Sequence, residues 1–209
     1  MLKNGFLVCL LTFFSLIISC KKNSSIQPNI VFIMADDLGY ADLSSYGSDF
    51  INTPYLDKMA LNGAKLTSYY SPQAVCSASR AAVLTGAYSN RIGINGAFGP
   101  KSKEGINQSE LLISEMLKEN GYTTGIFGKW HLGNEGFYPE DQGFDYNFGG
   151  NQTGSPKGGY FSPYKNPNIL DGPKGEYLTD RLGNEVLNFI DTNQNETFFA
   201  YVSFYSCLL

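Results

Sequence analysis

A cysteine, two adjacent aspartates and three basic side chains have the types and spacing that could carry out chemistry on an anion. They are Asp36, Asp37, Cys76, Arg80, Lys129 and His131. An arginine and a lysine that converge can stabilise a group with several anionic oxygens, such as sulfate or phosphate. The histidine is the side chain of this set that can transfer a proton near neutral pH.

The two adjacent aspartates indicate a cation site, with a solvated turn as the alternative. Carboxylates at close approach repel each other by ~1 to 4 kcal/mol, and a bound cation turns that repulsion into attraction. Oxygen ligands favour a hard ion, Ca²⁺ or Mg²⁺. A zinc site with two histidines is excluded, because the chain contains one histidine.

These side chains follow or precede predicted elements of a parallel α/β sheet. The apolar run over 29–35 is typical of a central strand covered on both faces, and the aspartates follow it. A strand over 122–128 runs into Lys129 and His131, whose spacing places both on one side if the chain stays extended. Reactive groups gather at the carboxyl ends of parallel strands, so we expect the three segments to share one cleft.

Cys76 lies just before a predicted helix over 78–86, whose N-terminus favours negative charge. Arg80 is one turn along and faces the same way. As a lone residue, Cys76 could be a packing residue, a disulfide partner or a reactive centre. A disulfide with Cys207 is the weaker interpretation, because two cysteines make no framework and Cys207 lies close to the last residue.

The remaining pattern alternates helices with strands, which predicts an α/β sandwich with a mostly parallel central sheet. With 209 residues and 43% hydrophobic composition, the chain can bury the core of one domain. We expect a helix over 53–63, a strand over 64–70, a helix over 107–121 with a capping box at Asn107 and Glu110, a long surface excursion over 134–177, a helix over 178–193 and a last strand over 197–205.

The N-terminus predicts export. Residues 1–19 have a positive start at Lys3 and a short apolar core, as in a secretory signal peptide. The stretch ends "LIISC" at Cys20, which resembles the lipobox of bacterial lipoproteins, and 20–28 would form a polar tether. An ordinary signal peptide cleaved nearby is the alternative. We therefore expect a periplasmic or cell-surface lipoprotein of a bacterium that contacts the membrane only through its lipid.

The net charge of −4 and the lack of a basic block argue against nucleic acid as a partner.

Three stretches of the sequence belong together, namely "PNIVFIMADDLGYADLSSYGS", "CSASRAAVLTG" and "GYTTGIFGKWHLG". In this order, over about Pro28 to Tyr205, they resemble the sulfatase family. The resemblance implies an alkaline-phosphatase-like α/β/α domain that cleaves sulfate from an aryl or carbohydrate sulfate ester. Family members supply further ligands downstream, whereas this chain ends "SCLL". We therefore expect 29–209 to be the N-terminal part of a catalytic domain truncated at its C-terminus.

The same resemblance implies a role for each site residue. A maturation enzyme would oxidise Cys76 to Cα-formylglycine, whose hydrate attacks sulfur. Asp36, Asp37 and the modified Cys76 would be ligands to a cation, in this family usually Ca²⁺ rather than Mg²⁺. Arg80 would support the hydrate, Lys129 would contact it and the sulfate, and His131 would hydrogen-bond the hydrate and assist its deprotonation.

Three alternatives belong to other classes of protein. A phosphatase or phosphonate hydrolase of the same superfamily would also use a cation and an anion cradle. An inactive truncated remnant, or a lipid-anchored carbohydrate-binding protein, would not turn over a substrate. The complete "CSASR" and "GKWH" set favours sulfate.

Lipidation at Cys20 is tested by replacing it. Cys20→Ser should release the chain from the membrane fraction or block its processing, because the lipid is attached through the thiol. Membrane fractionation with mass spectrometry of the mature N-terminus measures this. A wild-type chain that is soluble and begins at another residue contradicts the lipobox interpretation.

Overall fold

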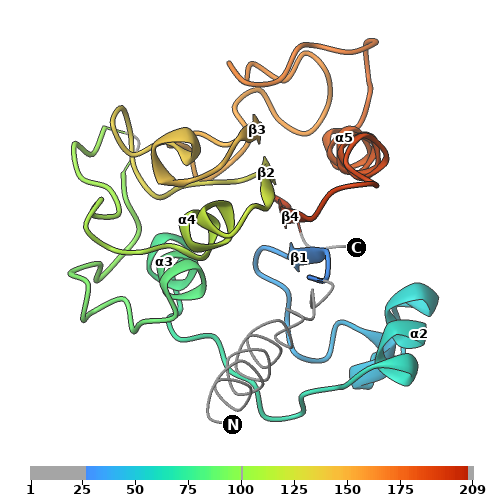
Figure 1. The fold of residues 1–209 in the computed structure, drawn as a ribbon. Helices are drawn as coiled ribbons and strands as arrows, with labels where there is room; N and C mark the ends of the chain where they lie inside the picture. The colour runs from blue at the N-terminus through green and yellow to red at the C-terminus, as the bar shows by residue number, and fades with distance from the viewer. Residues whose placement is uncertain (1–26, 100, 207–209) are drawn as a thin grey trace, which may run out of the picture.

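A computed structural model describes residues 27–99 and 101–206 of the chain. The predicted signal peptide, Cys20 and Cys207 lie outside these residues. The described strands form one parallel sheet in the order β1-β4-β2-β3 (Figure 1). Their bounds are β1 Ile30–Met34, β2 Thr123–Gly128, β3 Tyr146–Phe148 and β4 Phe198–Ser203.

Helices cover both faces of this sheet. In Figure 1, α3 and α4 lie on one side of the strands and α5 lies on the other. The bounds are α2 Pro54–Asn62, α3 Cys76–Thr85, α4 Ile113–Glu119 and α5 Leu178–Thr192, with short 3-10 turns η1 Ser44–Tyr46 and η2 Pro139–Gln142. The predicted α/β/α sandwich is confirmed, as are the helices expected at α2, α3 and α5. Among the described residues, no helix is long and apolar enough to cross a membrane.

The central strand β4 separates two apolar cores. Its side chains alternate between faces: Phe199 and Tyr201 pack with α3 and α4, while Phe198, Ala200 and Val202 pack with α5. Every residue of β4 is buried, as expected for a parallel strand with helices on both sides.

Each helix presents an apolar face that fits the core it covers. Helix α5 buries residues spaced one helical turn apart, namely Leu178, Leu182, Val186 and Phe189. Helix α3 instead buries small residues, Ala78 and Ala81, in the core that also contains Phe199 and Tyr201 of β4.

Two predicted strands differ from the structure. Strand β1 lies at an edge of the described sheet rather than at its centre, and Val31, Phe32 and Ile33 are 44%, 39% and 47% exposed. An apolar run shows that a strand forms but does not say how many neighbours it has. The segment 64–70 forms no strand. Its residues are exposed and have no ladder partner among the described residues, and strand propensity takes effect only in such a ladder.

The helix predicted from residue 107 begins later, at Ile113. The N–H of Leu112 donates to the Glu115 carboxylate at 2.8 Å, so this carboxylate occupies the helix start that we assigned to Glu110. The Asn107 side chain accepts from the Ser109 N–H at 3.0 Å and closes a local turn instead.

The region 134–177 is not only a surface excursion. It contains β3, which pairs in parallel with β2, and it buries Tyr164 and Ile169 in the core under α5. Strand β3 has three residues, too few for a period-2 pattern to be recognised in a segment rich in glycine and proline.

Strand β2 ends at a glycine that the packing of the sheet requires. Gly128 has a φ of +101°, and a Cβ there would overlap the Ser203 carbonyl oxygen. Gly47 is a matched control, since its φ is +102° and no heavy atom lies within 4 Å of an added Cβ. Gly47→Ala should lower the free energy of unfolding only by the cost of a left-handed backbone at alanine, about 1–3 kcal/mol. We expect Gly128→Ala to lower the free energy of unfolding in urea by clearly more, and equal effects of both variants would contradict the overlap.

Candidate active site at the strand ends

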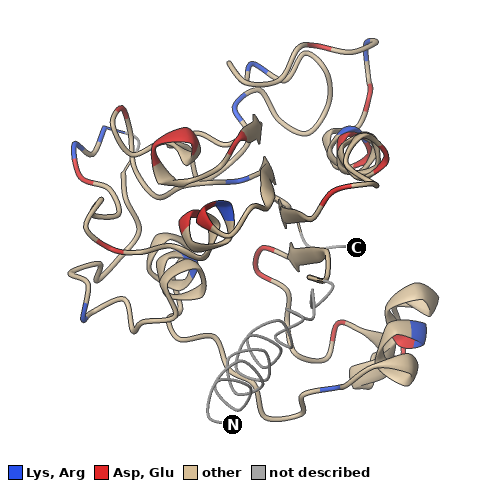
Figure 2. Ribbon diagram, in the orientation of Figure 1, with Lys and Arg blue, Asp and Glu red and all other residues tan. Residues whose placement is uncertain are grey.

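The register of the sheet brings three strand ends to one level. Met34 at the end of β1 and Gly128 at the end of β2 both pair with Ser203 of β4. The acidic turn after β1 is red in Figure 2, and a basic position, blue, follows β2. Asp36 and Lys129 therefore leave the sheet side by side, on the two sides of β4.

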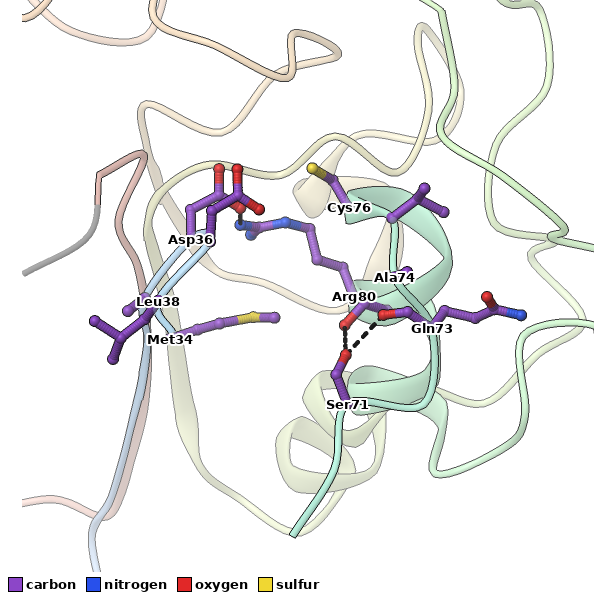
Figure 3. Close-up of a pocket in the computed structure, with 12 residues that line it drawn as sticks. Met34, Asp36, Leu38, Ser71, Gln73, Ala74, Cys76 and Arg80 are labelled. Carbon is purple, nitrogen blue, oxygen red and sulfur yellow. Dashed lines mark hydrogen bonds and ion pairs between the residues drawn. The ribbon is translucent and has the colours of Figure 1, made fainter. Parts of the chain in front are cut away.

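Cys76 is the first residue of α3 and faces these strand ends. It is partly buried and carries a free thiol. A cavity of about 310 Å³ opens between the start of α3 and the turn after β1 (Figure 3). Asp36, Asp37, Cys76 and Arg80 contribute to its wall. The predicted shared cleft thus exists, and the helix start adds a partial positive charge to it.

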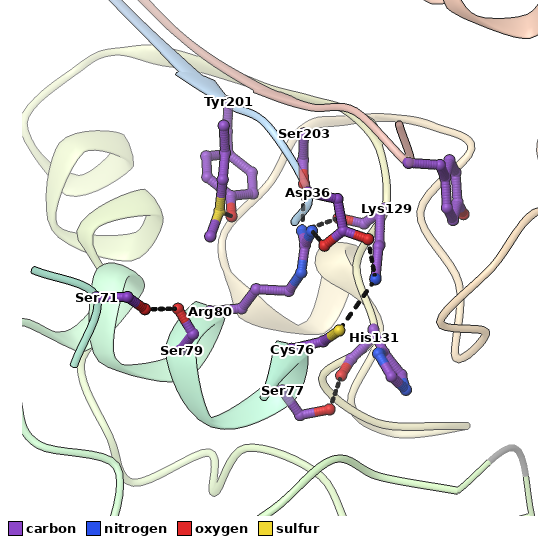
Figure 4. A network of polar contacts seen from close by, with 12 residues as sticks. Asp36, Ser71, Cys76, Ser77, Ser79, Arg80, Lys129, His131, Tyr201 and Ser203 are labelled. Carbon is purple, nitrogen blue, oxygen red and sulfur yellow. Dashed lines mark hydrogen bonds and ion pairs between the residues drawn. The ribbon is translucent and has the colours of Figure 1, made fainter. Parts of the chain in front are cut away.

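The Asp36 carboxylate lies between two buried cations (Figure 4). One oxygen is 2.9 Å from an Arg80 guanidinium nitrogen, and the other is 2.6 Å from the Lys129 ammonium. The side chains of Arg80 and Lys129 are each 1% exposed. Buried cations without a counter-charge are costly, so Asp36 is what allows both to stay in the site.

Arg80 also ties the strand ends together. Its Nη1 donates to the Lys129 carbonyl at 3.0 Å and to the Ser203 hydroxyl. The guanidinium therefore touches residues that follow or end β1, β4 and β2. These contacts fix its position beside the Asp36 carboxylate (Figure 4).

The Lys129 ammonium lies 3.3 Å from the Cys76 sulfur. A cation at this distance stabilises negative charge on the atom at position 76, whether sulfur or oxygen. The sequence predicted that Lys129 would contact residue 76, and its ammonium is in direct contact with the Cys76 sulfur.

His131 lies next to this group but turns its ring elsewhere. Its φ is +58°, so the chain does not stay extended from Lys129 as the sequence pattern assumed. The ring Nε2 is 2.8 Å from the Phe98 carbonyl oxygen. Burial lowers the pKa of His131 below its ordinary value of 6.5; the Phe98 carbonyl opposes this, and the charges of Lys129 and Arg80 reinforce it. The imidazole is therefore mainly neutral at pH 7.

The donor atoms of Asp36, Asp37 and Cys76 lie within 4.8 Å of one another, which fits a shared cation. Asp37 has a φ of +55°, a conformation that aspartate tolerates better than most residues. Both aspartates line the cavity beside Cys76, and Asp36 is labelled in Figure 3.

Several contributors were not expected from the sequence. Ser203 ends β4, but the predicted strand ran on to Tyr205, so the strand-end rule applied to the predicted bounds did not point to it. Ser77 lies inside the "CSASR" stretch, and its hydroxyl donates to the His131 carbonyl at 2.7 Å. The carbonyls of Phe98 and Asn151 contact His131 through backbone atoms, for which a sequence carries no signal.

Comparison with known proteins places the chain in a family. Residues 28–207 match the family model described as Sulfatase. The chain is 37% identical over 203 residues to an arylsulfatase of Hemicentrotus pulcherrimus, covering 86% of this chain and 37% of that protein. It is 44% identical over 154 residues to an N-acetylgalactosamine-6-sulfatase of Rattus norvegicus, covering 68% of this chain and 28% of that protein. The chain belongs to the sulfatase family, and it spans well under half the length of these relatives.

Solved structures show the same fold. Ps i-CgsB in complex with k-i-k-neocarrahexaose has a TM-score of 0.73 at 34% identity, covering 85% of this chain and 45% of that chain. A protein solved with its substrate D-glucosamine-2-N,6-O-disulfate has a TM-score of 0.68 at 27% identity, covering 86% of this chain and 34% of that one. A phosphonate monoester hydrolase of Agrobacterium radiobacter, at 18% identity and a TM-score of 0.62, shares the fold.

Removing the charge of Asp36 should destabilise the fold. Asp36→Asn leaves Arg80 and Lys129 buried without their counter-charge, which typically costs about 3–5 kcal/mol. Asp37→Asn is the matched control, because Asp37 is exposed and asparagine tolerates its backbone conformation. Urea denaturation with a chelator present, so that metal binding does not contribute, measures both. Equal stability of the two variants would show that Asp36 does not hold the cations.

Proposed function

We propose that this chain holds the nucleophile and cation ligands of a hydrolase that cleaves sulfate from aryl or carbohydrate sulfate esters. The observation that carries this proposal is Cys76 at the start of α3, 3.3 Å from Lys129 and within 4.8 Å of the Asp36 and Asp37 donor atoms. In the sulfatase family a cysteine at this place is converted to Cα-formylglycine, and we extend that conversion to Cys76. A formylglycine-generating enzyme is then a required partner.

The formylglycine would supply, as its hydrate, an oxygen nucleophile for the sulfur atom of the ester. Lys129 stabilises negative charge at position 76 and on the sulfate, because its ammonium lies at that position already. Arg80 keeps Asp36 oriented through its ion pair and adds positive charge beside it. His131, neutral because burial lowers its pKa, can accept a proton from a hydroxyl.

The donor set supports a hard cation together with this conversion. Asp36 and Asp37 offer oxygen ligands, whereas the thiol sulfur of Cys76 is a soft ligand. An oxygen in place of that sulfur gives an all-oxygen set, which suits Ca²⁺ and, with stricter geometry, Mg²⁺. We propose Ca²⁺, because three nearby donors on a turn and a helix start suit its more flexible coordination.

The charges at the site favour a sulfate over a phosphate ester. Asp36 and Asp37 balance Arg80 and Lys129, and His131 is neutral. A divalent cation then leaves two positive charges, which match a singly charged sulfate ester and one ionised hydroxyl. A phosphate monoester carries close to two charges at pH 7 and would exceed this balance. The phosphonate hydrolase alternative rests on the shared fold alone.

A sulfated carbohydrate is the substrate class that the relatives favour. One relative is named for N-acetylgalactosamine-6-sulfate chemistry, and the solved structures hold neocarrahexaose and a disulfated glucosamine. An exported protein anchored by lipid at Cys20 would meet such polymers outside the cytoplasm. Aryl sulfates are the second substrate class, as the name of the Hemicentrotus pulcherrimus arylsulfatase indicates.

Conversion of Cys76 can be measured directly. Co-expression with a formylglycine-generating enzyme should replace the Cys76 thiol with an aldehyde, while Cys207 in the same chain keeps its thiol as an internal control. Mass spectrometry of the tryptic peptides and labelling with a hydrazide probe report the change. Cys76→Ala should lose the hydrazide signal. A Cys76 that remains a thiol under these conditions would remove the basis of the proposed function.

A further inference from the structure

The buried hydroxyl of Ser77 links His131 to the loop that holds its ring. Ser77 Oγ donates to the His131 carbonyl at 2.7 Å and accepts the Phe98 N–H at 3.0 Å. Ser77 is fully buried, so water does not replace these bonds. Because Phe98 also provides the carbonyl that contacts the His131 ring, one hydroxyl sets both the backbone of His131 and its ring partner.

The Phe98 carbonyl decides which nitrogen of the imidazole carries hydrogen. A carbonyl oxygen only accepts, so Nε2 of His131 must donate to it. In the neutral ring Nδ1 is then an acceptor. Nδ1 is buried and has no hydrogen-bond partner among the described residues. The left-handed backbone of His131 is held in addition by its N–H, which donates to the Asn151 carbonyl at 3.1 Å.

Gly154 closes the other side of the ring. A Cβ on Gly154 would lie 2.5 Å from Cε1 and 2.8 Å from Nδ1 of His131, closer than real Cβ contacts allow. The φ of Gly154 is not in the left-handed region. Space for the imidazole, rather than backbone freedom, is therefore what requires glycine at this position.

We propose that Ser77 and Gly154 are positioning residues that keep the His131 ring against the Phe98 carbonyl and so keep Nδ1 as the unprotonated, acceptor nitrogen of the ring. Ser77 follows Cys76 directly, so the first turn of α3 carries both residue 76 and the hydroxyl that positions the His131 ring. This inference rests on the proposed function in one respect. If residue 76 is a hydrated formylglycine, its hydroxyl is the group whose proton Nδ1 would accept.

The single histidine of the chain allows a direct test. The full chain is labelled with ¹⁵N in its imidazole and purified without a polyhistidine tag. Spectra are recorded at about pH 8, above the ordinary histidine pKa of ~6.5. We expect hydrogen on Nε2, an unprotonated Nδ1, and an Nε2–H signal that exchanges slowly with water.

Ser77→Ala and Gly154→Ala should each release the ring. The expected result is an Nε2–H exchange rate faster by on the order of tenfold or more, as for the loss of one hydrogen bond of ordinary net strength. Ser79→Ala is the matched control on the same helix, because the Ser79 hydroxyl contacts Ser71 at 3.0 Å on an exposed side. Gly96→Ala is the matched glycine control, because no heavy atom lies within 4 Å of an added Cβ.

Wild-type exchange as fast as in a free imidazole, or unchanged exchange in both variants while the controls behave as wild type, would overturn the proposal. Thermal unfolding of each variant shows that it remains folded, and if Ser77→Ala does not fold, Gly154→Ala decides. The readout requires neither conversion of Cys76 nor turnover. Failure of the proposed function therefore leaves this test valid, and failure of the positioning proposal leaves the conversion of Cys76 unaffected.

Discussion

The site depends on one carboxylate that neutralises two buried cations. Asp36 holds Arg80 and Lys129 from different segments, and each of these side chains is 1% exposed. Without it the cations would have to reach water, which would separate the start of α3 from the end of β2. The pairing of these charges therefore determines the geometry around Cys76, whatever reaction the site carries out. The same pairing explains how an interior position can present positive charge to an anion.

The sheet turns this pairing into a defined geometry. Met34, Ser203 and Gly128 stand in register, so the segments that follow β1 and β2 leave the sheet at equal height. The Ser203 hydroxyl then accepts from Arg80 at the middle of the row. Helix α3 packs Ala78 and Ala81 in the core beside these strands, and the sulfur of its first residue, Cys76, lies 3.3 Å from the Lys129 ammonium. Packing, register and charge therefore specify one position for Cys76.

Sequence patterns predicted the parts of this arrangement that are local. Helix α5 has clear apolar spacing, α3 ends at a glycine, and Asp36 and Lys129 meet at the strand ends with Arg80 of α3, as expected. Strand order could not be predicted in this way. The run at β1 is as apolar as a central strand, yet among the described residues β1 pairs with β4 alone and lies at the edge. The ring partner of His131 was also inaccessible, since a backbone carbonyl such as that of Phe98 can belong to any residue.

The place of β4 has a consequence for biosynthesis. It is the last described strand in the sequence, but it lies between β1 and β2, and its first contacts join Ile30 to Phe199. Nearly the whole described chain must therefore leave the ribosome before the sheet can close. Pairing over such long sequence separations is slow. During that interval the segment around Cys76 is not yet enclosed by the strand ends, so a modifying enzyme would meet it as accessible polypeptide rather than as the wall of a finished site.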